Sequence, residues 1–167
     1  MKVVGIIPCR YESSRFPGKL LALINNKPMM WHVYQRCLES GVLDKVYIAA
    51  DDERIELEAK KLGLDVVMTS KKHSTGTDRV AEAASNIKSD YYVNIQGDEP
   101  LIDPEAIKLV TDEIVNCTDP LVQATNAYAP LTNPSDVNDT NVVKVITDTE
   151  SNALAYSRQP IPFPKSG

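Results

Sequence analysis

The side chains with the clearest chemical potential lie close to the N-terminus, just after a short apolar run at residues 3–7. Arg10, Arg15 and Lys19 bring cations to this segment, and Gly18 lets the backbone approach a ligand closely. Guanidinium and ammonium groups are common partners of phosphate oxygens. A cluster of cations is most often a solvated surface loop. Because the whole chain carries a net charge of −5, we favour a polyphosphate-binding loop over a solvated one.

Two familiar phosphate-binding motifs do not match this loop. A Walker A motif requires G-x-x-x-x-G-K-[ST], but Ser13 stands at the first glycine position and Leu20 at the Ser/Thr position. The dinucleotide fingerprint G-x-G-x-x-G is absent. Phosphates would therefore be held mainly by side chains, which suits a nucleoside triphosphate.

A second candidate motif, Gln96-Gly97-Asp98-Glu99-Pro100, directly follows a predicted strand. Mg²⁺ in proteins is commonly held by one or two carboxylates together with substrate phosphates, and Asp98 is placed to supply one. The simpler interpretation is an acidic turn before a helix capped by Asp103, but it leaves Gln96-Gly97-Asp98 unexplained. If the two loops are neighbours, one would hold a triphosphate and the other its metal ion.

A third candidate is the segment from His73 to Arg79, His-Ser-Thr-Gly-Thr-Asp-Arg. Thr75 and Asp78 have the spacing of a helix capping box, which is a purely structural interpretation. A Ser/Thr/Gly loop also offers backbone groups that could bind the edge of a base, and Arg79 could reach an anion or a carbonyl. Both interpretations remain open from the residues alone.

Arg158 is the fourth candidate. A lone arginine is usually solvated, but this one follows a short predicted strand and precedes the proline-rich segment 160–164. A guanidinium in such a stiffened turn could bind a carboxylate.

The hydrophobic pattern predicts alternating strands and helices that would bring these loops together. Helices are expected after Pro28, after Asp51 or Asp52, near Thr77 and from Pro104. The predicted strands cover residues 3–7, 45–50, 65–69, 91–95, 121–128, 142–147 and 153–157. This alternation predicts an α/β fold with a mostly parallel central sheet and helices on both faces. Ligands of such sheets bind beyond the carboxyl ends of the strands.

Composition narrows the class of protein. The 167 residues are 43% hydrophobic and 25% charged, as expected for one globular domain over residues 1–167. An isoelectric point near 5.0 argues against a nucleic-acid partner, and no apolar run is long enough for a membrane span. Cys9, Cys37 and Cys117 are scattered, which suits reduced thiols in the cytoplasm. With His32 and His73 as the only histidines, a zinc site is not expected.

Five motifs, taken together, resemble those of the 3-deoxy-manno-octulosonate (Kdo) cytidylyltransferase family, also called CMP-Kdo synthetases. They run in order along the chain at residues 6–19 (I-I-P-x-R-Y-x-S-x-R-x-P-G-K), 73–79 (H-x-x-G-T-[DE]-R), 94–100 (N-x-Q-G-D-E-P), 141–145 (N-x-V-K-V) and 156–162 (Y-S-R-x-x-I-P). The sialic-acid cytidylyltransferases are similar in fold but have an R-G-G-S-K type of first loop, which Arg10-Tyr11 does not fit.

The resemblance implies a Rossmann-like nucleotidyltransferase that uses CTP and Mg²⁺ to make CMP-Kdo for lipopolysaccharide. It assigns catalytic roles to Arg10, Arg15, Lys19 and Asp98, with Asp98 as the metal ligand. It assigns nucleotide contacts to Pro8, Cys9, Arg10, Lys19, Ser74, Gly76 and Arg79, and acid-sugar contacts to Arg15, Gln96 and Arg158.

Family members continue well beyond the last residue of this chain. We therefore expect a domain that is incomplete at its C-terminus and inactive alone, and a homodimer in the full-length form. Two alternatives stay open: a cytidylyltransferase for another acid sugar (8-amino-Kdo or a nonulosonate), or a non-catalytic nucleotide-binding fragment.

Overall fold

The computed structural model describes residues 1–13 and 16–161. The chain divides into two compact units, Met1–Thr125 and Asn126–Gly167, and each unit is described by itself. This division does not test the expected single domain over residues 1–167, which stays a prediction.

A four-stranded parallel sheet organises the first unit. Its central strand is β1 (Val3–Cys9), in which all seven residues are buried. β1 pairs on one side with β4 (Lys45–Ala50) and on the other with β6 (Tyr91–Asn94), while β5 (Val66–Met68) extends the sheet beyond β4. The order β5-β4-β1-β6 confirms the parallel sheet and the first four predicted strands.

The helices of this unit begin close to the positions that their capping signals predict. They are α1 (Met29–Glu39), α2 (Glu53–Lys61), α3 (Gly76–Asn86) and α4 (Pro104–Asn116). Asp52 and Asp103 each accept a hydrogen bond of 3.0 Å from the backbone amide two residues later. Thr75 and Asp78 form the complete capping box of α3. No helix in the part of the chain that the structure describes is long and apolar enough to cross a membrane.

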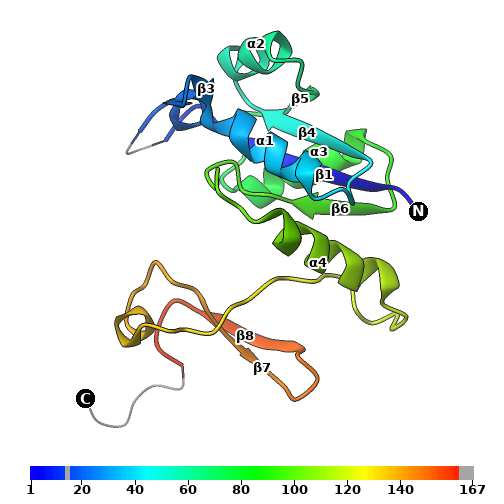
Figure 1. Cartoon of the computed structure of the whole chain (residues 1–167), viewed down its shortest axis with the longest axis vertical. Helices are drawn as coiled ribbons and strands as arrows, with labels where there is room; N and C mark the ends of the chain where they lie inside the picture. The colour runs from blue at the N-terminus through cyan, green and yellow to red at the C-terminus, as the bar shows by residue number, and fades with distance from the viewer. Residues whose placement is uncertain (14–15, 162–167) are drawn as a thin grey trace. The chain divides into compact units, whose positions relative to one another are not determined.

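Helices cover both faces of the sheet, as the alternating pattern predicts. On one face Val4 and Ile6 of β1 pack with Val80 and Ala83 of α3. On the other face Ile7 belongs to a larger buried cluster that draws on the remaining helices through Met30, Val33, Ile55 and Ile107. In Figure 1, α1 and α3 lie on opposite sides of β1. The period of two along β1 is therefore what builds both halves of the core.

A hairpin and a short turn of 3₁₀ helix connect β1 to α1. The 3₁₀ turn is Lys19–Leu21, and the hairpin joins β2 (Leu23–Ile24) to β3 (Lys27–Pro28). Asn25 and Asn26 between them have φ of 48° and 63°, the left-handed conformation that a two-residue hairpin turn requires.

The second unit contains a 3₁₀ turn, Pro134–Val137, and an antiparallel pair, β7 (Lys144–Thr147) and β8 (Ala153–Ser157). Both strands were predicted. The strand predicted at residues 121–128 is wrong, because those residues are described without any ladder pairing. Its apolar residues suggested a strand, but Leu121 is exposed and extended backbone becomes a strand only when a neighbour accepts its hydrogen bonds.

Candidate active site

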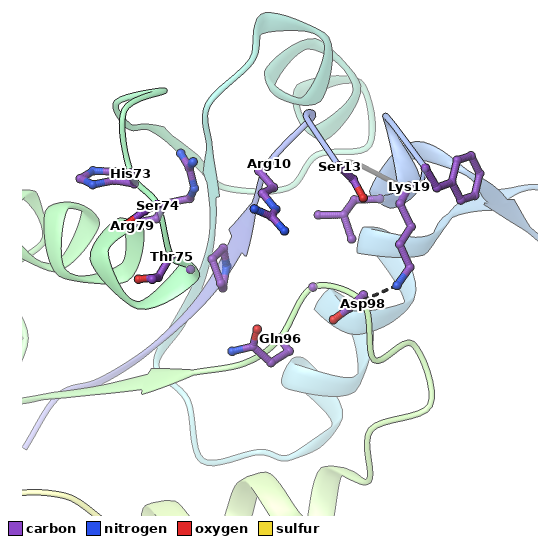
Figure 2. A pocket seen from close by; sticks show the side chains of 14 residues that line it. Arg10, Ser13, Lys19, His73, Ser74, Thr75, Arg79, Gln96 and Asp98 are labelled. Carbon is purple, nitrogen blue, oxygen red and sulfur yellow. Dashed lines mark hydrogen bonds and ion pairs between the residues drawn. The ribbon is translucent and has the colours of Figure 1, made fainter. Parts of the chain in front are cut away.

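A cavity of about 680 Å³ opens beyond the carboxyl ends of β1 and β6. Its walls come from the loop after β1, the segment around the start of α3 and the loop after β6, as Figure 2 shows. The lining residues are Pro8, Arg10, Ser13, Phe16, Lys19, Leu20, His73, Ser74, Thr75, Gly76, Arg79, Gln96, Gly97 and Asp98. This is the edge at which open parallel sheets bind their ligands.

Most of the residues predicted for the site therefore line one cavity. Three do not appear in its lining. Arg15 lies outside the described residues, and Cys9 is fully buried. Arg158 belongs to the second unit, where its Nη1 donates to the Thr140 carbonyl at 2.8 Å. The roles predicted for these three residues stay predictions.

Lys19 and Asp98 form an ion pair across the cavity, with 2.8 Å between Nζ and Oδ2. They come from the loops after β1 and β6, so these two loops are neighbours, as the parallel strands predict. The side chains are 38% and 49% exposed, which leaves the pair weak because solvent screens it. A phosphate group could therefore take the ammonium, and a cation the carboxylate, at little cost.

Gly97 stands where these two loops touch. A Cβ at this position would lie 3.0 Å from the Pro8 carbonyl oxygen, 3.2 Å from Leu20 Cδ1 and 3.4 Å from Cys9 Sγ. The chain turns here, since the Glu99 amide donates to the Gln96 carbonyl at 3.3 Å, and the close packing explains why the residue is a glycine. Burial raises the pKa of the Cys9 thiol far above its usual range, so this side chain packs below the cavity as a neutral thiol.

Arg79 is 3% exposed, and acceptors within the protein surround its guanidinium. Nη2 donates to Asp51 Oδ2 at 2.9 Å, and Nη1 donates to Thr69 Oγ1 at 2.6 Å and to the Ser70 carbonyl at 3.2 Å. These contacts favour a supporting role for Arg79 over the direct ligand contact that the sequence suggested. The sequence indicates Asp51 only as a possible helix cap, and its position directly after β4 is the signal that identifies it as a residue near the cavity.

The loop before α3 is also held by Glu82. Its Oε2 accepts a hydrogen bond of 2.8 Å from the Ser70 amide and contacts His73 Nε2. The Ser70 amide first, and His73 second, hold the pKa of the Glu82 carboxyl below its usual value. The capping-box interpretation of this segment is confirmed, and Ser74 and Thr75 line the cavity as well.

The loop after β1 is held by contacts that the sequence analysis missed. The Gly18 amide, at φ 70°, donates to the Tyr11 carbonyl at 2.7 Å and closes the loop on itself. The Arg54 guanidinium stacks on the Tyr11 ring, with 3.3 Å from Cζ to the ring centroid. Asp52 fixes that guanidinium through two hydrogen bonds of 2.7 and 2.9 Å.

Among the described residues that line the cavity, Asp98 alone carries a carboxylate. Within residues 1–13 and 16–161, no group of three or more His, Cys, Asp or Glu side chains could hold a metal ion by itself. One carboxylate fits an ion such as Mg²⁺, which takes further ligands from phosphates and water. It does not fit an ion that needs a complete protein ligand set.

Comparisons with known proteins give the following matches. The cytidylyltransferase family model matches residues 4–166. The 3-deoxy-manno-octulosonate cytidylyltransferases of Solibacter usitatus and Geobacter metallireducens are 48% and 46% identical to the chain, over 97% of its length and 64% and 63% of theirs. The solved structure of CMP:2-keto-3-deoxy-manno-octonic acid synthetase complexed with CTP has a TM-score of 0.87 and 37% identity, covering 99% of this chain and 67% of that one. The chain thus spans about 64% of the length of the curated relatives that it matches.

Proposed function

The chain belongs to the cytidylyltransferase family, and from this premise we propose that it is the nucleotide-binding part of an enzyme that transfers CMP from CTP to the anomeric hydroxyl of Kdo. Pyrophosphate leaves, and the product, CMP-Kdo, serves lipopolysaccharide biosynthesis. The observation that carries the proposal is the Lys19–Asp98 pair, 2.8 Å apart and half-exposed in a cavity of about 680 Å³. Relatives named for Kdo support this acid sugar as the acceptor.

In this reaction the hydroxyl oxygen of the sugar attacks the α-phosphorus of CTP in line, and the bond from phosphorus to the pyrophosphate oxygen breaks. Such a transfer requires positioning and neutralisation of charge, and no covalent enzyme intermediate. Arg10 and Lys19 would stabilise the negative charge that builds on the leaving pyrophosphate. Arg15 is proposed to join them.

The other side of the cavity would bind the base. Ser74 and Gly76 present backbone and hydroxyl groups there, and a Cβ on Gly76 would lie 3.4 Å from the Pro8 ring. Pro8 and Cys9 would form the floor beneath the nucleotide. Gln96, beside Asp98, would contact the acid sugar, and Arg158 is proposed to bind its carboxylate.

Asp98 would hold Mg²⁺ together with the phosphates of CTP. When bound, the ion supplies positive charge to the α-phosphate and lowers the pKa of the attacking hydroxyl. Asp98 would then give up its contact with Lys19, whose ammonium becomes available for phosphate oxygens. The ion pair would thus be the resting arrangement of two groups that act on the same ligand.

Two alternatives are kept because the chain spans about 64% of its curated relatives. A non-catalytic nucleotide-binding fragment would bind CTP without releasing pyrophosphate in the presence of Kdo. An enzyme for another acid sugar would release pyrophosphate faster with 8-amino-Kdo or a nonulosonate than with Kdo. Cytoplasmic localisation and a homodimeric full-length form stay predictions.

The test is CTP binding by calorimetry, with and without Mg²⁺. Lys19→Ala should lose about 1.5–3 kcal/mol of affinity, since a hydrogen bond to a charged group is removed. Lys61→Ala, on the exposed surface of α2, is the matched control and should bind as the unchanged chain does. Asp98→Asn should abolish the strengthening of CTP binding by Mg²⁺. Equal affinity of Lys19→Ala and Lys61→Ala for CTP would refute the phosphate-binding loop.

A further inference from the structure

Asp51 stands between the two sides of the cavity and accepts a hydrogen bond from each. Its Oδ1 accepts a hydrogen bond of 2.9 Å from the amide of Tyr11, which lies in the loop that carries Arg10 and Lys19. Its Oδ2 accepts a hydrogen bond of 2.9 Å from Nη2 of Arg79, which lies in α3 at the other side of the cavity. Figure 2 shows Lys19 across the cavity from His73, Ser74 and Thr75.

Arg79 continues this connection to the loop before α3. Its Nη1 binds the Thr69 hydroxyl and the Ser70 carbonyl, where that loop begins. Thr69 is in turn anchored to the Ala50 carbonyl by its amide at 2.8 Å and its hydroxyl at 2.9 Å. A continuous chain of hydrogen bonds therefore runs from Tyr11 through Asp51 and Arg79 to Thr69.

Burying the Asp51–Arg79 ion pair costs free energy of desolvation, so the pair is a poor means of stabilising a fold. Asp51 and Arg79 are 7% and 3% exposed, so both charges lose most of their hydration. Buried ion pairs can often be replaced by apolar residues of similar shape without loss of stability. What an apolar pair could not supply is directed hydrogen bonds to backbone and hydroxyl groups of two separate loops.

We propose that Asp51 and Arg79 are positioning residues that hold the loop after β1 and the loop before α3 at the separation that one nucleotide requires. The proposal rests on the proposed function, since it assigns the phosphates to one loop and the base to the other. Neither side chain touches the reacting atoms. A ligand that spans both loops depends on their relative position, whereas a ligand confined to one loop depends on it less.

Asp51→Asn is the main test. An amide offers one acceptor oxygen in place of two, so only one of the donors, Tyr11 or Arg79, keeps its partner. Thr69→Val is the milder variant, because it removes one acceptor of Arg79 and leaves the ion pair and the Thr69 amide contact intact. Ile107→Val, on the buried side of α4, is the control that lowers stability without changing this chain of hydrogen bonds.

Two measurements are made well below the unfolding temperature of each variant. The first, without ligand, is amide hydrogen exchange at Tyr11 and residues 70–75, which should rise in Asp51→Asn and not in Ile107→Val. The second is affinity for CTP and for inorganic tripolyphosphate. For Asp51→Asn, CTP should weaken by about tenfold or more and tripolyphosphate by less, and Thr69→Val should show the same order with smaller changes, since each variant loses charge-assisted hydrogen bonds.

A lower unfolding temperature with unchanged exchange in both loops and unchanged CTP affinity would overturn the proposal and leave a stabilising ion pair. Equal weakening of CTP and tripolyphosphate would also overturn it. If the unchanged chain does not bind CTP, the proposed function fails at this site. The exchange measurement then decides the inference alone, since a rise in both loops supports the coupling and a rise in one loop or neither refutes it.

Discussion

Different forces stabilise each of the two compact units. Among the described residues, every buried aliphatic or aromatic side chain of the core lies between Val3 and Ile107, in the first unit. In the second unit Lys144 and Pro160 are the buried residues within the described range, while Leu154 and Tyr156 of β8 are exposed. Burial of apolar surface therefore stabilises the fold of the first unit, and hydrogen bonds to the backbone stabilise the fold of the second.

Lys144 shows how the second unit manages without an apolar core. Its ammonium donates to three carbonyls, those of Asp139, Val142 and Arg158, at 2.6, 3.0 and 2.9 Å. The side chain is 5% exposed and connects the loop before β7 with the end of β8. A two-stranded hairpin is marginally stable by itself, so these few polar contacts carry much of the local order.

The largest difference between the units should appear on trimming isoleucine side chains. Ile48→Ala, at 0% exposure in β4, should cost about 2–5 kcal/mol of unfolding free energy because it leaves a cavity in the core. Ile146→Ala, at 37% exposure in β7, should cost less than about 1 kcal/mol. Urea unfolding of the two variants measures both values, and similar costs would show that the second unit has a core of its own.

Removal of the Lys144 ammonium should have the next largest effect. Lys144→Met keeps the length of the side chain but loses three charge-assisted hydrogen bonds, and it should cost the second unit about 1.5–3 kcal/mol. Amide exchange should rise at residues 139–158 and stay unchanged in β1 and β4. Lys45→Met, whose side chain is half-exposed, is the control. An equal rise of amide exchange in both units would show that Lys144 does not act on the second unit alone.

Close packing in the first unit extends to its loops, which a matched pair of glycines can test. Gly97→Ala places a Cβ 3.0 Å from a backbone carbonyl and should cost about 1–3 kcal/mol. Gly76→Ala meets only ordinary contact, at 3.4 Å from the Pro8 ring, and should cost less because it lies in the first turn of α3. Thermal unfolding compares them, and a tolerant Gly97 would mean that the loop after β6 can move away.

Local patterns in the sequence were enough to predict the parallel sheet, the helices and the neighbouring positions of the two loops that carry Lys19 and Asp98. These two residues follow β1 and β6, and adjacent parallel strands bring their carboxyl ends together whatever the loops contain. Capping signals at Asp52, Thr75 and Asp103 act within one helical turn, so they too can be found by inspection.

The contacts that support the cavity could not be predicted in this way. Asp51 and Arg79 are 28 residues apart in the chain, and their pairing depends on how α3 packs on the sheet. The stacking of Arg54 on Tyr11 depends likewise on tertiary geometry. The strand expected at residues 121–128 failed for the converse reason, since an apolar pattern does not say whether a partner strand exists.

The smallest expected effect concerns acid, and it begins with the carboxylates whose pKa the fold lowers. In the first unit Arg54 lowers the pKa of Asp52, and the Thr75 hydroxyl lowers that of Asp78. In the second unit the Asn152 side chain, followed by the amides of Asn152 and Glu150, lowers the pKa of Asp148. Protonation removes helix caps from the first unit, whose core remains, but it removes the organising acceptor of the β7–β8 turn.

A carboxylate with a lowered pKa in the folded state contributes stability above its unfolded pKa, about 4 for aspartate, and loses it as the pH falls through the folded value. The β7–β8 hairpin should therefore lose amide protection as the pH falls below about 4, and it should do so before β1 and β4. In Asp148→Asn the amide oxygen remains an acceptor but no longer titrates, so protection of residues 144–157 should be lower at neutral pH and almost independent of pH. Amide exchange corrected for the intrinsic rate at each pH measures this dependence. If the hairpin of Asp148→Asn opened with the same acid dependence as that of the unchanged chain, Asp148 would not be the group that the acid acts on.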